Sequence, residues 1–243
     1  MSAIYKKEML TYFTCPTGYV FAAIFFALSG AAFSITTFGM GTTSTRIYFI
    51  LMLVSFIVLI PLLTMKLLSE ERKTKTEQII LTSPVSLMGI ICAKFLAAYT
   101  LFTITLLTSS ALNVFTLYNF AKEQEDVITK LNLPTVFGSV AGILCIGAVF
   151  VAIGLFLSAL TETQIVAAIS SIGVFVLIFL FSILPSFVGN SVARTVIKWL
   201  SLFDRFYLFT EGVFDLTAIV YYISLTIVFL FLTIRVYESR RWA

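Results

Sequence analysis

The residues whose types could do chemistry gather in one stretch, Lys66–Ser86, a strongly charged segment between two long apolar runs. Within about three helical turns it carries Lys66, Glu70, Glu71, Arg72, Lys73, Lys75 and Glu77. Catalysis is not indicated, because the chain has no histidine and no GxxxxGK[ST], HExxH, CxxC or GxSxG motif. We therefore predict no catalytic, cofactor-binding or metal-binding residue, and we expect any energy to be supplied by another protein.

The second half of this stretch predicts a short amphipathic helix. Thr74 and Glu77 have the spacing of a capping box, in which each side chain caps the backbone amide region of the other. An apolar face of Ile79, Ile80 and Leu81 follows, and Ser83-Pro84 ends the helix, since proline disfavours helix at the residue before it. Such a helix suits a groove on a partner protein or the surface of a lipid bilayer, and the residues leave both interpretations open.

The elements that position this stretch are long apolar segments. Of 243 residues, 60% are hydrophobic and only 12% are charged, whereas about a quarter of the residues of a soluble domain are charged. An all-α integral membrane protein of one domain, residues 1–243, is therefore predicted. The net charge of +4 is expected to hold cytoplasmic loops in place rather than to bind nucleic acid.

Six segments are each about as long as a membrane-crossing helix, which needs roughly 20 residues. We place them at residues 19–38, 47–68, 87–117, 136–160, 164–184 and 216–236. Pro61 should kink the second, and the polar run 119–132 is expected to be a loop. Residues 1–15 predict an interfacial helix, with a disordered tail as the alternative, and residues 69–84 form the region of the short charged helix.

Basic residues near the span ends suggest that both termini are cytoplasmic. On that topology ten of the sixteen Lys and Arg residues are cytoplasmic: Lys6, Lys7, Lys66, Arg72, Lys73, Lys75, Lys94, Arg235, Arg240 and Arg241. Charged side chains such as Lys66, Lys94, Glu162 and Asp215 lie near predicted span ends, where we expect them to reach water. No ion-coupling site at mid-membrane is therefore predicted.

Residues 186–214 are too polar to cross a bilayer and too aromatic for an ordinary loop. Aromatic rings favour the headgroup region, so two short helices dipping back into the outer leaflet are predicted, with a plain external loop as the alternative. In the fourth span Gly138, Gly142, Gly147 and Gly154 predict a face that a neighbouring helix approaches closely. The pattern leaves open whether that neighbour belongs to the same chain.

The run PLLTMKLLSEERKTKTEQIILTSPVS closely resembles the segment from the second span to the coupling helix of ABC-2 type exporter permeases. It is nearest to the gliding-motility-associated and copper-enzyme-maturation groups. The matching positions are Pro61, Leu62, Thr64, Met65, Glu70, Glu71, Arg72, Thr76, Glu77, Ile80, Leu81, Pro84 and Val85. The opening KKEMLTYFTCPTGYV, the FDRF run at 203–206, Gly212 and the terminal ESRRW are also similar to that family.

The resemblance implies a six-span fold like that of type V exporters, with an interfacial helix, a cytoplasmic coupling helix and an outer re-entrant pair. It implies a dimer of permease subunits, homo- or heteromeric, in the bacterial cytoplasmic membrane, with the first and fifth spans facing the other permease. Two ABC ATPase subunits would bind ATP and Mg²⁺ and push on the coupling segment. The coupling residues implied are Glu70, Glu71, Arg72, Thr76, Glu77, Ile79, Ile80, Leu81 and Pro84, and the outer segment includes Trp199, Phe203, Asp204, Phe206 and Gly212.

One departure from the family pattern concerns the turn before the coupling helix. The family usually has glycine where this chain has Lys75, and glycine allows a left-handed turn. With lysine we expect another turn geometry or a longer helix. A second interpretation of the whole chain is a membrane-embedded sensor or assembly factor that binds an ATPase without moving a substrate. That protein would lack a continuous cavity at its dimer interface.

Overall fold

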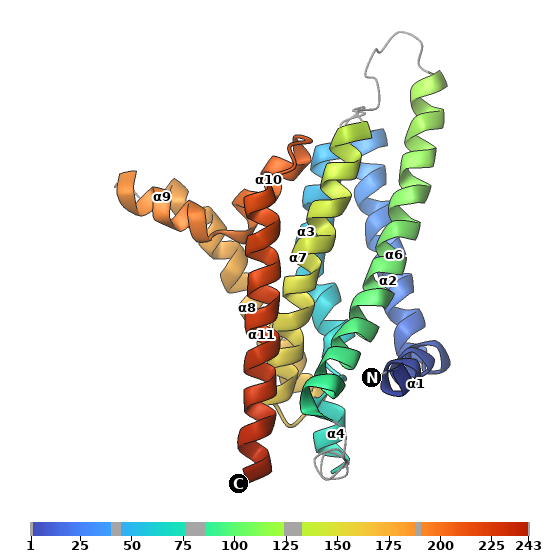
Figure 1. Cartoon of the computed structure of the whole chain (residues 1–243). Helices are drawn as coiled ribbons and strands as arrows, with labels where there is room; N and C mark the ends of the chain where they lie inside the picture. Colours follow the sequence, from blue (N-terminus) through green and yellow to red (C-terminus); the bar gives the residue numbers. More distant parts are fainter. Residues whose placement is uncertain (1, 40–44, 76–85, 124–132, 188–190, 243) are drawn as a thin grey trace.

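A computed structural model of the chain describes residues 2–39, 45–75, 86–123, 133–187 and 191–242, and within these ranges the regular structure is entirely helical (Figure 1). Six helices, the first two with short extensions, are long and apolar enough to cross a membrane. The prediction of an all-helical membrane protein with six spans is therefore confirmed. These helices are α2 (Pro16–Phe33, continued by the π-helix η1, Ser34–Gly39), α3 (Thr45–Thr64), α6 (Leu87–Glu123), α7 (Leu133–Leu160), α8 (Gln164–Ile183) and α11 (Leu216–Trp242).

The shorter helices lie at the two ends of this bundle. At one end are α1 (Ser2–Thr14) and α4 (Ser69–Lys73), together with both chain termini (Figure 1). Toward the other end are α9 (Ser191–Leu200) and α10 (Leu202–Thr210), with α9 pointing away from the bundle. An even number of spans requires both termini to lie at the same end, as they do here.

Helix α7 is the centre of the bundle, and its glycines admit neighbours from the same chain. It packs against α3, α6, α8, α10 and α11. A Cβ atom at Gly138 would lie 2.7 Å from the carbonyl oxygen of Phe209, and one at Gly142 would press on the ring of the same residue. A Cβ at Gly147 would overlap Phe102 of α6, and one at Gly154 would overlap Thr64 of α3. Along α7 the glycine face is therefore in close contact first with α10, then with α6 and then with α3.

At the end of the bundle where α1 and α4 lie, two prolines are found where a helix begins or ends. Pro16 is the first residue of α2, where its missing N–H costs nothing, and Cys15 before it is extended. Pro61 lies inside α3, but the regular helix ends at Thr64, three residues later, instead of continuing past a kink. The turn that follows separates α3 from α4.

The aromatic segment after α8 forms two short helices, but its rings are not all at the surface. Phe203, Phe206 and Phe209 of α10 are buried against the bundle, whereas Trp199 of α9 is exposed. The rings of α10 fill the space left by the glycines of α7, and the placement of the two short helices in the outer leaflet stays a prediction. Gly212 ends α10 with φ +79°, and the amide of Val213 donates to the carbonyl of Leu208, 3.2 Å away.

Helix α6 also differs from its predicted extent. It continues to Glu123, so the first part of the polar run 119–132 is helical, and the remainder of that run lies largely outside the described residues. The turn between α7 and α8 is as short as predicted, since α7 ends at Leu160 and α8 begins at Gln164. The hydroxyl of Thr163 accepts a hydrogen bond from the amide of Val166 and so caps α8.

We predict that Gly154→Ala destabilises the protein by about 1–3 kcal/mol, because overpacking forces close-packed helices apart. The added Cβ would lie 2.9 Å from the Cβ of Thr64, which is itself fully buried. Gly39→Ala at the end of η1 is the control, since the one atom within 4 Å of its Cβ position, the carbonyl oxygen of Ser34, lies at an ordinary contact distance of 3.9 Å. Thermal unfolding of the detergent-solubilised proteins should show a lower Tm for the first variant only. Equal Tm values would show that α3 and α7 are not in tight contact.

Candidate functional site

Helix α4 is held at its start by a side chain from α7. The backbone amides of Leu68 and Ser69 both donate to the hydroxyl oxygen of Ser158, at 3.2 and 3.1 Å. The first amides of any helix have no partner inside it, and Leu68 at the N-cap offers no side-chain bond of its own. Ser158 therefore substitutes for a local cap and ties the turn after α3 to α7.

The end of α4 is closed by Thr74 and Lys75. The Thr74 hydroxyl donates to the carbonyl of Glu70 at 2.9 Å, and the Lys75 amide donates to the carbonyl of Arg72 at 3.1 Å. Lys75 has φ +57°, which is the left-handed conformation that glycine adopts most easily. Our expectation that lysine here requires a different turn is therefore wrong, because the chain keeps the left-handed turn and accepts a cost of about 1–2 kcal/mol.

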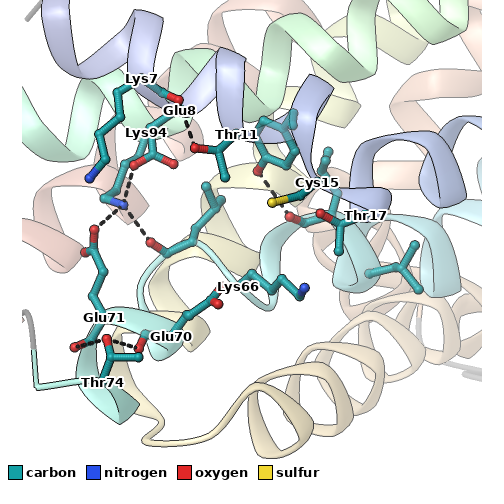
Figure 2. A pocket seen from close by; sticks show the side chains of 14 residues that line it. Lys7, Glu8, Thr11, Cys15, Thr17, Lys66, Glu70, Glu71, Thr74 and Lys94 are labelled. Carbon is teal, nitrogen blue, oxygen red and sulfur yellow. Dashed lines mark hydrogen bonds and ion pairs between the residues drawn. The ribbon is translucent and has the colours of Figure 1, made fainter.

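A buried lysine joins α4 to α6 and α1. The Lys94 ammonium lies 2.7 Å from a carboxylate oxygen of Glu71, 2.9 Å from one of Glu8 and 2.9 Å from the carbonyl oxygen of Leu67 (Figure 2). An ammonium has three donors, and each has an acceptor here. We call Glu8, Glu71 and Lys94 the lysine triad. It fastens α1, α6 and the elbow at one point, where the elbow means the turn after α3 together with α4 and its end, residues 65–75.

The triad corrects the prediction that Lys94 reaches water. Lys94 is only 2% exposed, so its charge is compensated by partners rather than by solvent. Removing a charge from water without a partner is very costly, which explains why two carboxylates and a carbonyl converge on it. The triad has one positive and two negative groups.

On its other side α4 contacts the turn between α7 and α8. One nitrogen of the Arg72 guanidinium lies 2.6 Å from a carboxylate oxygen of Glu162, and another donates to the carbonyl of Leu160 at 3.2 Å. From α11, the guanidinium of Arg240 donates to the carbonyl of Ala159 at 2.5 Å. Both α4 and α11 therefore hold the end of α7. The ion pair between Arg72 and Glu162 contributes little to this, because Glu162 is exposed to solvent.

A cavity of about 490 Å³ lies between α1, the end of α3, α4 and α6. Its walls carry charged side chains, hydroxyl groups and leucines, and the lysine triad forms one side (Figure 2). The Tyr12 hydroxyl donates to the carbonyl of Leu63 at 3.3 Å and closes another side. Burial raises the pKa of Tyr12, and the charge of Glu8 raises it further, so the phenol stays neutral and acts as a hydrogen-bond donor.

The predicted coupling residues are only partly described. Glu70 lines the cavity, Glu71 belongs to the triad and Arg72 forms an ion pair with Glu162 in the α7–α8 turn. Thr76, Glu77, Ile79, Ile80, Leu81 and Pro84 lie outside the described residues, as does most of the predicted coupling helix. The capping box is therefore seen only at Thr74, whose hydroxyl hydrogen is directed back into α4.

The predicted residues of the outer segment lie at the other end of the bundle from α4 (Figure 1). Arg205 donates twice to the carbonyl of Trp199, at 3.1 and 3.0 Å, and lies over the ring of Tyr221. The Asp204 amide is capped by the Ser201 hydroxyl at 3.2 Å. These contacts fix α9 and α10 on α11, so the structure brings together two separate groups and no single site containing both.

Glu8, Lys94 and Ser158 were missed as site residues. One signal for Lys94 was present, since it is a lysine seven residues inside an apolar helix, and an ionisable residue in such a helix is a candidate functional residue by default. Nothing in the sequence identified its partners, because Glu8 is 86 positions away. Ser158 carried no signal at all, since serine is ordinary in a membrane helix.

Residues 32–237 match the family model described as ABC-2 family transporter protein. No curated protein matches the chain.

We predict that Lys94→Met destabilises the protein by about 3–5 kcal/mol, because it leaves two buried carboxylates without their cation. The triple variant Glu8→Gln, Glu71→Gln, Lys94→Met removes all three charges and should recover most of the Tm lost. Arg235→Ala, which breaks an exposed ion pair with Glu238, should change stability by less than about 1 kcal/mol. A Tm for Lys94→Met equal to that of Arg235→Ala would contradict the buried triad.

Proposed function

The chain belongs to the ABC-2 family of transporter proteins, and from this premise we propose that it is the permease subunit of an ATP-driven exporter. Two copies, or this chain and a related one, would form the path that the substrate takes. Two separate ATPase subunits would bind ATP and Mg²⁺ and supply the force. The absence of a nucleotide-binding loop from this sequence supports a division of labour in which hydrolysis lies in the partner.

The observation that carries the proposal is that α4 is anchored on both of its sides. Glu71 connects it to α6 and α1 through Lys94, and Arg72 connects it to the α7–α8 turn. A push on the segment after Lys75 would therefore reach four helices without needing a new contact.

The position of α4 supports a cytoplasmic coupling role. It lies at the same end of the bundle as both termini (Figure 1), and that end carries most of the basic residues that favour the cytoplasmic side. We propose that the protein lies in a bacterial cytoplasmic membrane with this end inside the cell. The coupling helix would then comprise Ile79, Ile80 and Leu81 as the face presented to the ATPase.

Exposed apolar faces support a dimer through the first and fifth spans. In the most apolar part of each helix, 17% of the residues of α8, 22% of those of α11 and 33% of those of α2 are buried, against 56–61% for α3, α6 and α7. Three spans therefore have exposed apolar faces, and glycines distinguish α2 and α8 among them. Gly30 of α2 and Gly173 of α8 each have no atom within 4 Å of the Cβ position. Small exposed residues let a neighbouring helix come close in a membrane, so we place the second permease subunit on these faces.

We predict that Ile80→Asp abolishes stimulation of the partner ATPase and its co-purification, because it buries an unpaired charge at a docking face, a cost on the order of a few kcal/mol. The tagged full-length chain would be purified from its host, and bound ATPase and its activity would be measured together with Tm. Ile80→Leu is the matched control and should behave as the wild type.

Two results would count against this assignment. Unchanged ATPase stimulation in Ile80→Asp would remove the coupling role of the apolar face. ATPase binding without ATP-dependent transport in sealed vesicles would instead favour the sensor or assembly factor.

A further inference from the structure

The cavity beneath α1 has features that the coupling role does not use. Its volume of about 490 Å³ lies within the range of small-ligand sites, roughly 300–1,000 Å³. The lysine triad occupies one side, where the Lys94 ammonium has its three acceptors, whereas Lys66 lies in the wall away from it. We propose that this cavity binds the phosphate headgroup of a membrane phospholipid, with Lys66 as the principal cation.

The distribution of charge in the cavity favours an anion away from the triad. The lining carries Lys7, Lys66 and Lys94 against Glu8, Glu70 and Glu71, so the cavity as a whole has no net charge. Lys7 acts on Glu71 of the triad, which leaves Lys66 as the cation on the other side. Lys66 makes no hydrogen bond or ion pair with another residue in the described ranges, and in Figure 2 its ammonium points away from the triad. An ammonium held inside a partly apolar cavity is most stable beside an anion.

A hydroxyl group adds a second contact for the same anion. Thr17, in the first turn of α2, lines the cavity, and its hydroxyl has no hydrogen bond with any residue in the described part of the chain. Figure 2 places Thr17 and the Lys66 ammonium on the same side of the cavity, away from the triad. A phosphate there would accept from an ammonium on the α3–α4 turn and from a hydroxyl on α2.

The surroundings indicate a lipid rather than a soluble phosphate. The apolar part of the wall is formed by Leu62, Leu63 and Leu67. Beside the cavity, α1 and α2 also have exposed apolar side chains: Leu10, Phe13, Tyr19 and Val20. These side chains offer an apolar path for acyl chains next to the headgroup. The cavity also lies at the end of the spans, where the polar headgroups of a bilayer are found.

A bound headgroup would act as a brace. It would join the start of α2 to the turn between α3 and α4, beside the place where the triad joins α1 to α4. The elbow would then be held by two links, one within the protein and one through the lipid. This role concerns lipid binding alone and stands apart from the proposed coupling to an ATPase.

The test uses the purified full-length chain, stripped of lipid in detergent and titrated with phosphatidylglycerol by native mass spectrometry. We expect Lys66→Gln to weaken binding roughly tenfold, the loss of about one charge-assisted hydrogen bond, and Lys66→Arg to bind within about threefold of the wild type. Lys73→Gln is the matched control, because Lys73 lies exposed on the same elbow but does not line the cavity, and it should bind as the wild type does.

Three results would overturn the proposal. Equal loss in Lys66→Gln and Lys73→Gln would mean that only general surface charge attracts the lipid. Diacylglycerol bound as tightly as phosphatidylglycerol would exclude recognition of the phosphate. Inorganic phosphate bound at this site in the absence of lipid binding would assign it to a soluble anion. Because no ATPase is present, none of these results bears on the coupling proposal, and loss of ATPase stimulation would not alter them.

Discussion

The arrangement at the α1–α4 end depends on the need to compensate one buried charge. Lys94 lies in α6, where neither water nor lipid can stabilise an ammonium, so carboxylates must come to it. Glu8 comes from α1 and Glu71 from α4, and the carbonyl of Leu67 comes from the turn between α3 and α4. The positions of α1 and α4 are consequences of this pairing. A hydrophobic residue at position 94 would leave both helices without a fixed partner.

Away from the lysine triad, the helices of the bundle associate by close packing rather than by removing apolar surface from water. Lipid is as apolar as leucine, so helices in a membrane associate through packing and internal hydrogen bonds. The glycines of α7 let Phe209, Phe102 and Thr64 reach its backbone. A polar cluster of Ser29, Tyr48, Ser109 and Asn113, with separations of 2.5–2.9 Å, joins α2, α3 and α6 in the same way.

Local signals in the sequence were sufficient to predict the helices but not to predict which helices contact one another. Hydropathy identified the six spans and, from the gap between residues 160 and 164, the short turn between the fourth and the fifth. The partners of Lys94 are 23 and 86 residues from it in the chain, and no periodicity encodes such a pairing. The glycines of α7 predicted a close neighbour but not that it would be α10, because α10 was assigned to the headgroup region. Lys75 shows that the backbone preference of a residue type does not always decide its conformation, since the fold imposes a left-handed turn on this lysine.

The two ends of the molecule are connected by one helix. Ser158 of α7 holds the start of α4, and Gly138 of the same helix receives Phe209 of α10. These positions are 20 residues apart, or about 30 Å along a helix axis. A movement of α4 that tilts or shifts α7 must therefore displace α10 as well, because a close-packed contact slides in steps and does not stretch. A protein whose ends were joined only by loops could shift α4 without moving α10, whereas here α7 is in contact with both.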